Sequence, residues 1–430
     1  MNKKIINIII KKLILFFITT GLLCVLLVST AWIPKEAIRH NSLVSAQYLM
    51  QKDVFFDAAS GINGSRIDRY ADSILLNIAY HYDREYPLRS VMVSAYYFTP
   101  SQDENANFLD AVKDDLGVNR QYLRYWHGSI LFVRPLLTVL SIRGIYILHA
   151  ILLILLFSAF LVTALRLRQR AVALAMTLAL IFTGIFFVPL SLEYTWNFLV
   201  MLAASLAALI LASREKPVDF GTFFMITGMI TCFLDFLTTE TLTLLIPLLI
   251  ILKVKKTPFK EAWKSSLYRA FCWGFGYAGI WAAKWGLTAI VYRENVIPYV
   301  AEHIGERLGG DLTGVSGLTM ITRAVTRNIF CLFPLGYGGA GAVAAIVIIL
   351  AGAYIAYVYH VNDFDRGSIL LFALIGIVPF IRFLILHNHS YIHYFFTYRA
   401  LGSTIFALVL IIACLTGEKG GPGSSPGKRR

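Results

Sequence analysis

Residues 11–32 read KKLILFFITTGLLCVLLVSTAW, an apolar run that follows two lysines and ends at a tryptophan. A helix needs roughly 20 apolar residues to cross the hydrocarbon core of a bilayer. Similar runs recur along the whole 430-residue chain, in which 57% of the residues are hydrophobic and 15% are charged. A soluble domain carries about 25% charged residues. The sequence therefore predicts an all-α polytopic membrane protein.

Ten apolar segments have the composition of transmembrane helices. The first lacks an A-x-A-like cleavage site, so we expect an uncleaved helix rather than a signal peptide. A large first extracytoplasmic loop, residues 33–142, follows it and carries interfacial segments, the last of them at 128–142. A second outer loop covers residues 293–328. The ten predicted spans are 13–32, 144–165, 171–188, 198–212, 220–236, 242–252, 270–292, 338–359 (in part), 369–386 and 401–415.

The formal net charge of +14 comes from short clusters of Lys and Arg between the apolar runs. The positive-inside rule places such clusters on the cytoplasmic side, so the charge indicates topology and not nucleic-acid binding. We expect both termini in the cytoplasm, and the start MNKK suits a bacterial cytoplasmic membrane. Residues 1–415 then form one transmembrane bundle. Residues 416–430 are basic and rich in Gly, Pro and Ser, which predicts a disordered cytoplasmic tail.

Two acids lie in the first outer loop, within the segment IDRYADSILLN at residues 67–77. Its apolar spacing predicts an amphipathic helix that carries Asp68 and Asp72 on one face. One carboxylate could act as general base towards an acceptor hydroxyl while the other positions it or holds a cation. The simpler interpretation, which spacing alone favours, is the solvated face of an interfacial helix.

The segment RYWHG at residues 124–128 combines an aromatic anchor, Trp126, with an imidazole, His127, and Arg134 follows it. These residues fall at the predicted membrane interface, where a lipid phosphate would lie. We therefore expect a substrate or phosphate site there. The alternative is an ordinary aromatic belt with arginines that extend to the interface.

The densest titratable chemistry lies at residues 387–399, HNHSYIHYFFTYR. His389, His393 and Arg399 would offer imidazolium and guanidinium donors to a phosphate. Arg382, inside the ninth span, would complete the same anion site. The spacing H-x-H-x-x-x-H could also hold a divalent metal, and plain interface polarity is a third interpretation.

The turn FLDFLTTE at residues 233–240 places two acids between consecutive short spans. Asp235 and Glu240 are candidates for substrate binding, because ionisable groups at bilayer depth default to a functional hypothesis. A structural ion pair is the alternative, with Lys284 in the seventh span as one possible partner.

This architecture resembles the GT-C superfamily of polytopic glycosyltransferases. The resemblance rests on one cytoplasmic-start helix, a long outer loop with acids, and a bundle that ends in a His-rich and basic outer turn. It implies that the first outer loop supplies a catalytic carboxylate, Asp72 or Asp68, with Glu36, Asp53 and Asp57 as other acids in the same loop. It also implies that a polyprenyl-phosphate sugar is the donor. Arg134, His389, His393 and Arg399 would steady the leaving phosphate, and a glycan or lipid would be the acceptor. No W-W-D-type signature is present.

The stretches RYWHG and HSYIHYFFTYR are also similar to those of uncharacterised bacterial multi-pass membrane proteins. A rival interpretation is a transporter or flippase for a lipid-linked or anionic substrate, which would use Asp235, Glu240, Lys284 and Arg382 as intramembrane charges. An outer cleft beside the first loop would favour transfer, and a path to both sides would favour transport. A non-catalytic scaffold would show neither.

Overall fold

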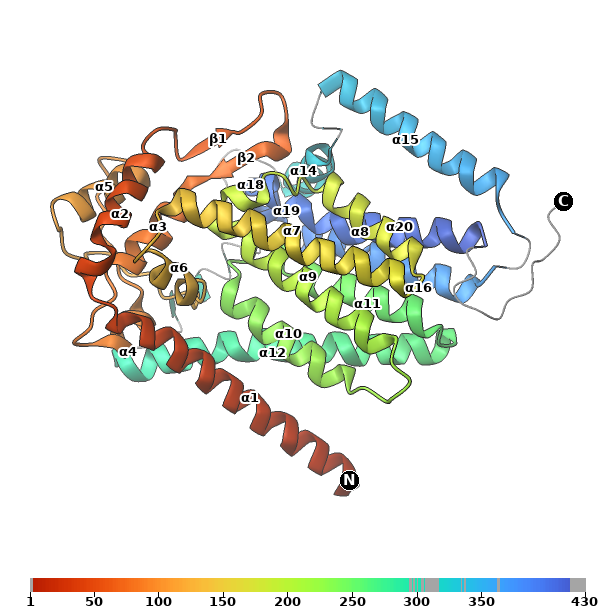
Figure 1. Cartoon of the computed structure of the whole chain (residues 1–430), viewed down its shortest axis with the longest axis horizontal. Helices are drawn as coiled ribbons and strands as arrows, with labels where there is room; N and C mark the ends of the chain where they lie inside the picture. Colours follow the sequence, from red (N-terminus) through yellow and green to blue (C-terminus); the bar gives the residue numbers. More distant parts are fainter. Residues whose placement is uncertain are drawn as a thin grey trace.

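A computed structural model describes residues 3–293, 296, 298–299, 301–302, 305, 317–333, 335, 338–361 and 364–417 (Figure 1). Helices dominate these residues, in agreement with the predicted all-α class. Much of the second outer loop and residues 418–430 of the predicted tail lie outside the described residues, so the predicted disorder of the tail stays a prediction.

Six segments of the described residues are long and apolar enough to cross a membrane, so the protein is a multi-pass integral membrane protein. The six comprise α1 (Lys3–Ser29) with η1 (Thr30–Trp32), α7 (Ile142–Arg166), α9 (Leu192–Ala212), α15 (Gly338–Val358), α16 (Arg366–Gly376) with α17 (Val378–Ile385), and α19 (Tyr394–Thr397) with η5 (Tyr398–Leu401) and α20 (Gly402–Leu415). The other predicted spans correspond to α8 (Arg170–Phe182), α10 (Phe220–Leu234), α11 (Leu242–Lys255) and α12 (Phe259–Tyr292).

Several helices differ in their bounds from the predicted spans, and α9 and α12 are two examples. The segment 191–197 lies between the predicted spans 171–188 and 198–212, but Ser191 is the N-cap of α9 and its side chain accepts a hydrogen bond from the Glu193 amide. A serine before an apolar run is a start signal for a helix, and this explains the error. The segment 259–269, expected to be a basic loop, forms the first turns of α12.

Close contact between α10 and α12 holds the centre of the bundle together. A Cβ atom at Gly228 would lie 2.2 Å from the Trp273 carbonyl oxygen, and one at Gly276 would lie 2.1 Å from the Met225 carbonyl oxygen. Small residues let helix backbones approach in this way inside a membrane. The two glycines therefore fix the distance between these helices.

The first outer loop folds into a separate cap of short elements at one end of the bundle (Figure 1). Its antiparallel pair of short strands was not predicted, because three-residue strands leave almost no alternation in the sequence. Phe55 pairs with Asp68 in this sheet. The elements of the cap are α2 (Lys35–Leu49), β1 (Phe55–Asp57), η2 (Asn63–Ser65), β2 (Arg66–Asp68), α3 (Arg69–Tyr80), α4 (Pro87–Val93), α5 (Glu104–Lys113) and α6 (Ile130–Leu136).

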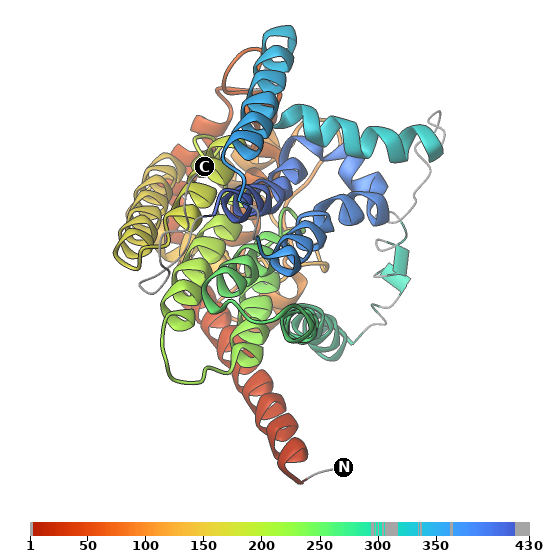
Figure 2. The same ribbon diagram turned by 90° about the vertical axis from the view of Figure 1, so that its right-hand side faces the viewer.

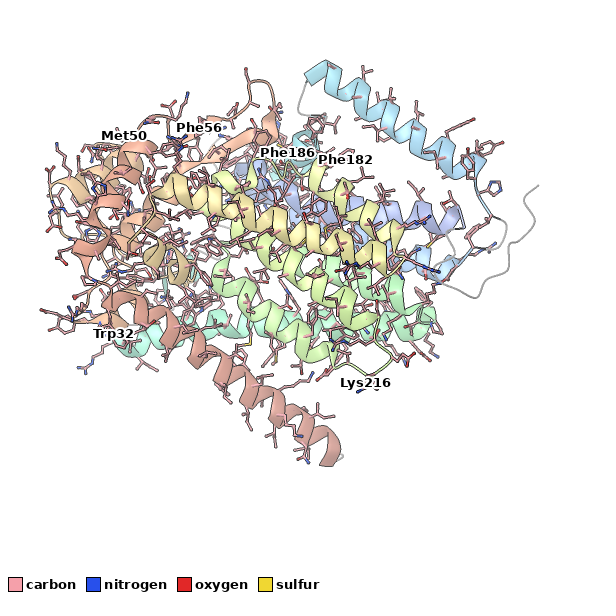
Figure 3. All side chains as sticks on the ribbon, viewed as in Figure 1. Trp32, Met50, Phe56, Phe182, Phe186 and Lys216 are labelled. Atoms are coloured by element: carbon pink, nitrogen blue, oxygen red, sulfur yellow. The ribbon has the colours of Figure 1, made fainter. Side chains whose placement is uncertain are left out.

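The opposite end of the bundle gathers the segments that were predicted to be cytoplasmic. Lys12 of α1 forms an ion pair of 3.2 Å with Asp219 and donates a hydrogen bond to Tyr268. Lys216 lies towards this end and Trp32 lies beside the cap (Figure 3). The two ends therefore have different chemistry, one basic and one formed by the cap.

Helix α15 lies apart from the rest of the bundle (Figures 1 and 2). Of its described side chains, Gly341 and Ala345 are buried, whereas Ile349 and Tyr357 are exposed. A helix that is apolar all round suits a position in lipid.

Candidate functional site

A cavity of about 660 Å³ lies where the cap meets the bundle, and we call it the inner cavity. Its walls come from β2, the start of α3, the segment 120–127, the first turn of α9, the α10–α11 turn and the segment 389–396. Aromatic rings supply much of the lining, and a few polar groups converge among them, which is typical of ligand sites. The polar side chains of interest are Asp68, Arg120, Arg124, His127, Glu193, His389 and His393.

Asp68 is positioned by its place between a strand and a helix. It ends β2 and is the N-cap of α3, where its carboxylate accepts a hydrogen bond of 2.8 Å from the Ala71 amide. The carboxyl group also contacts that of Glu193 within hydrogen-bonding range. Burial raises the pKa of Asp68 to about 6, against the opposing effects of the Ala71 amide and the Arg66 charge.

Glu193 reaches the inner cavity because Asp72 fixes the start of α9. Asp72 accepts hydrogen bonds from the Leu192 amide at 2.8 Å, from the Ser191 hydroxyl at 3.2 Å and from the Tyr146 hydroxyl. A carboxylate at a helix N-terminus satisfies free amides and opposes the helix dipole. Asp72 is fully buried and does not line the cavity, and burial raises its pKa to about 7.

His127 is held in a strained conformation at the cavity wall. Its φ angle is 52°, in the left-handed region, and a Cβ atom at the next residue, Gly128, would lie 2.3 Å from the Phe233 carbonyl oxygen. The imidazole lies 4.9 Å from the Tyr122 ring and 5.5 Å from the Phe236 ring, centroid to centroid. Strained residues of this kind cluster at functional sites.

Burial and the nearby positive charges of Lys284 and Arg124 lower the pKa of His127 well below its ordinary value. The imidazole is therefore neutral at physiological pH. Within the described part of the chain, neither its ring nitrogens nor Oε2 of Glu193 has a polar side-chain partner. Buried polar atoms in native proteins normally have partners, so these atoms are candidates for contact with a ligand or water.

His389 and His393 form the third polar group of the inner cavity, with ring centroids 4.8 Å apart. They lie on and directly after the short helix α18 (His387–Ile392). Asn328 of α14 (Gly317–Cys331) fixes this segment, because it donates to the Ser390 carbonyl and accepts from the Thr397 hydroxyl. The predicted outer turn thus reaches the same cavity as Asp68.

No protein-family model, curated protein or solved structure matches this chain.

The possible metal site has no counterpart in the described residues, where no three His, Cys, Asp or Glu side chains are grouped to hold an ion.

Three predicted phosphate-binding arginines do not line the inner cavity. Arg134 is fully buried and donates to the carbonyl oxygens of Ala79, Ile33 and Tyr82. Arg399 donates to the carbonyl oxygens of Phe395 and Gly64. Arg134 therefore joins segments within the cap, whereas Arg399 joins the bundle to Gly64 of the cap.

Arg382, the third, forms a bidentate ion pair with Glu240, with N–O distances of 2.6 and 3.0 Å. It also donates to the carbonyl oxygen of Leu237, whose φ angle is 65°. Asp235 accepts from the amide and the hydroxyl of Thr238. The α10–α11 turn therefore has the structural ion pair that was weighed as an alternative, with Arg382 in place of Lys284.

Lys284 and Trp126 are structural as well. Lys284 donates to the carbonyl oxygens of Val91 and Met92, at the end of α4. The Trp126 indole donates to the Ile280 carbonyl at 2.8 Å and is fully buried. Neither side chain lines the inner cavity.

The sequence interpretation missed Glu193 and Arg120 as site residues and gave Arg124 no role of its own. Arg124 lies in the RYWHG segment, and Glu193 is an acid between the predicted spans 171–188 and 198–212, so both had a signal in the sequence. Arg120 had none, because it lies in a loop whose path only the folded cap defines.

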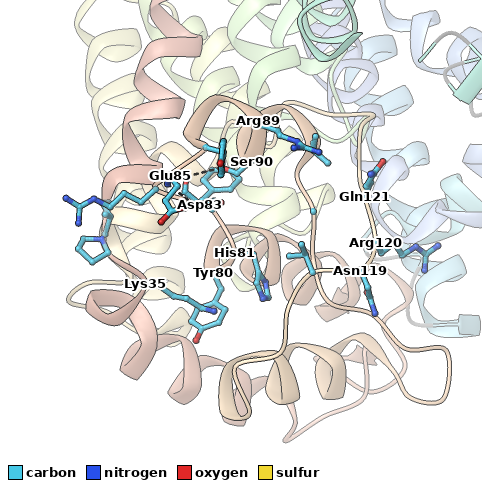
Figure 4. Close-up of a pocket in the computed structure, with 18 of the residues that line it drawn as sticks. Lys35, Tyr80, His81, Asp83, Glu85, Arg89, Ser90, Asn119, Arg120 and Gln121 are labelled. Atoms are coloured by element: carbon cyan, nitrogen blue, oxygen red, sulfur yellow. Dashed lines mark hydrogen bonds between the residues drawn. The ribbon is translucent and has the colours of Figure 1, made fainter. Parts of the chain in front are cut away.

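A second and more open cavity of about 760 Å³ lies beside the first, and we call it the outer groove. Figure 4 shows that residues of the segments 80–90 and 119–121 face this space. Arg89 and Ser90 lie on its α4 side. Arg120 and Gln121 line both cavities, so this short segment forms their shared wall.

Proposed function

We propose that this protein is a membrane glycosyltransferase of the GT-C type, which moves a sugar from a polyprenyl-phosphate donor to an extracytoplasmic glycan or lipid acceptor. The observation that carries the proposal is the inner cavity. There two buried carboxyl groups, three imidazoles and two guanidinium groups converge from segments far apart in the sequence. Titratable groups with shifted pKa values in a cleft are typical of catalytic sites.

Asp68 is the better candidate for the general base than Asp72. Asp68 lines the inner cavity, and its pKa of about 6 leaves it ionised near neutral pH. A base works best when its pKa lies close to the working pH. Asp72 is enclosed by Tyr146, Ser191 and Leu192 and acts on the site through the position of Glu193.

In the proposed step, the acceptor oxygen forms a bond to the anomeric carbon of the donor sugar. Its proton passes to the Asp68 carboxylate. The bond between the anomeric carbon and the phosphate oxygen breaks, and its electron pair stays on the leaving lipid phosphate. Negative charge thus grows on that phosphate, where cationic donors stabilise the transition state more than the ground state.

The donors for that charge are Arg120 and Arg124, together with His389 and His393. These residues line the inner cavity, whereas Arg134, Arg382 and Arg399 have partners elsewhere. The proposed phosphate site therefore includes the predicted His389 and His393. Arg120 and Arg124 take the role that was predicted for Arg134, Arg382 and Arg399.

The outer groove is the proposed route for the acceptor. It shares Arg120 and Gln121 with the inner cavity, and its lining comes from the cap and the end of α12. A polar acceptor in the groove would meet the donor sugar at this shared wall.

The proposed topology has ten spans, with both termini in the cytoplasm of a bacterial membrane. It is supported by the basic end of the bundle, where Lys12 meets Asp219 and Lys255 donates to the Arg214 carbonyl. The positive-inside rule places that end in the cytoplasm and the cap outside. Helix α8, with 13 residues, is about 20 Å long and so needs its following segment to complete a crossing.

Transport of a lipid-linked or anionic substrate is the rival function. It would use Asp235, Glu240, Lys284 and Arg382, but these charges have protein partners in closed contacts. The inner cavity is lined from the cap end of the bundle. Both observations favour transfer over transport.

The test is product formation by the purified protein with a panel of polyprenyl-phosphate sugars. We expect Asp68→Asn to lower transfer by on the order of 100-fold or more, the usual effect of losing a general base. Asp72→Asn, the matched control, should retain transfer within about tenfold, because an amide can keep the contacts to Leu192 and Ser191. Equal activity of Asp68→Asn and wild type would remove Asp68 from the role. Substrate flux into liposomes without any transfer would establish transport instead.

A further inference from the structure

The inner cavity holds a second acid that the proposed step leaves without a role. Glu193 is 8% exposed, lines the cavity and contacts the carboxyl group of Asp68. Its Oε2 atom is buried and has no hydrogen-bond partner among the described residues. Two carboxyl groups in contact repel each other when both are ionised, so one shared proton is the stable arrangement.

The hydrogen bonds around the pair decide which acid carries the proton. Asp68 caps α3 and accepts the Ala71 amide, and it lies near the positive charge of Arg66. Both contacts favour its carboxylate form. Among the described residues, no backbone amide and no cation donates a hydrogen bond to Glu193 at the first turn of α9, so Glu193 is the better proton carrier.

We propose that Glu193 is the positioning residue of this site: its protonated carboxyl group donates to Asp68 and its Oε2 atom faces a hydroxyl of the ligand. The catalytic meaning of this arrangement depends on the proposed glycosyl transfer. The proton of Glu193 would hold the Asp68 carboxylate in one rotamer. Its Oε2 atom would accept a hydrogen bond from a hydroxyl-bearing ligand such as a sugar.

Other charged groups act on the pair from each neighbouring element. They come from α3, from the start of β2, from the α10–α11 turn, from the segment 120–127 and from the segment 387–393. They are Asp72, Arg66 and Asp235, together with the cavity-lining Arg120, Arg124, His127, His389 and His393, and with Glu302 beyond the end of α12. Because several of them titrate, the role of Glu193 is tested by comparing variants rather than by one profile.

The first test is the pH profile of transfer for wild type and Glu193→Gln. Wild type should lose activity below about pH 6, where Asp68 gains a proton, and should lose it again once the pH is high enough to remove the proton of Glu193. The glutamine amide donates to Asp68 at every pH. Glu193→Gln should therefore keep the acid limb and at least a tenth of the activity, and should lose the alkaline limb.

Two further variants separate this role from general damage. Glu193→Leu removes the donor and should lower transfer more than tenfold across the whole pH range. Glu261→Gln changes an exposed acid at the far end of α12 and should leave the profile unchanged. An alkaline limb that persists in Glu193→Gln would overturn the proposal.

The second test does not depend on transfer. Infrared spectra of wild type and Glu193→Gln at neutral pH should differ by one carboxylic-acid carbonyl band, which the variant lacks. If this carbonyl band is detected but the protein transfers no sugar, the result would support the protonated carboxyl pair and reject the glycosyltransferase function. Absence of the band from the difference spectrum would reject the protonated state of Glu193, whatever the protein transfers.

Discussion

The inner cavity and the α10–α11 turn both bury acids at the cap end of the bundle, but the acids have different partners in the two places. In the turn, Glu240 has a bidentate guanidinium partner, and Asp235 accepts from the amide and hydroxyl of Thr238. In the cavity, Asp68 meets another acid, Glu193. In the turn, the ion pair offsets much of the cost of burying the Glu240 carboxylate, whereas in the cavity Oε2 of Glu193 is left for a ligand to satisfy.

The largest expected effect comes from breaking the closed pair in the turn. Arg382→Met should lower the free energy of unfolding by about 3–5 kcal/mol, because it leaves the buried carboxylate of Glu240 without a partner. Thermal unfolding in detergent would measure it. The double variant Arg382→Met/Glu240→Leu should recover most of the loss, and a double variant as unstable as the single one would contradict the comparison.

A smaller loss is expected where the turn contacts the cavity wall. Gly128→Ala places a methyl group 2.3 Å from the Phe233 carbonyl oxygen, so the variant should lose about 1–3 kcal/mol of stability through overpacking. Gly117→Ala is the control, since its Cβ atom would meet nothing within 4 Å. Equal unfolding temperatures for the two variants would show that the cavity wall around Phe233 accommodates the methyl group without loss of stability.

The pH dependence of stability tests the buried state of Asp72. Its pKa of about 7 in the folded protein exceeds the ordinary 3.8, so the folded state binds the proton more tightly. Stability should therefore fall as pH rises through this window, by about 1 kcal/mol per pH unit between pH 4 and 7, and level off above it. The stability of Asp72→Asn should fall less steeply with pH, by the same amount per pH unit. Unfolding temperatures of both proteins, measured across this pH range, would check it. Parallel curves would mean that Asp72 is not buried as described.

The smallest effect on stability is expected at the residue with the largest proposed effect on activity. Asparagine caps a helix as well as aspartate does, so Asp68→Asn should change the free energy of unfolding by no more than about 0.5 kcal/mol. Denaturation of the same preparations used for transfer would check this. A large loss of stability in Asp68→Asn would turn its inactivity into a folding defect.

Local sequence patterns predicted much of the bundle and part of the site. Among the described residues, the apolar runs located the six helices that are long enough to span a membrane. The acids of 67–77, the RYWHG segment and the histidines of 387–393 were expected on one side, and they contribute to one cavity. The arginines were the weakest part of the prediction. Arg124 and Arg134 both adjoin the same motif, yet only Arg124 lines the cavity, because Arg134 points to backbone carbonyls of the cap. The spacing of residues in the sequence does not indicate the direction in which a side chain points.

The sequence by itself determined that the protein is helical and lives in a membrane, because apolar length and charge clusters act locally along the chain. Only the tertiary structure decided which acid meets the cavity. Asp68 and Asp72 lie one turn apart, but the cap directs Asp68 to Glu193 and encloses Asp72 against Tyr146 and α9. The reason is that burial and hydrogen bonding depend on distant neighbours, such as Tyr146, 74 residues from Asp72, and Leu192, 120 residues from it. No local sequence pattern indicates these contacts.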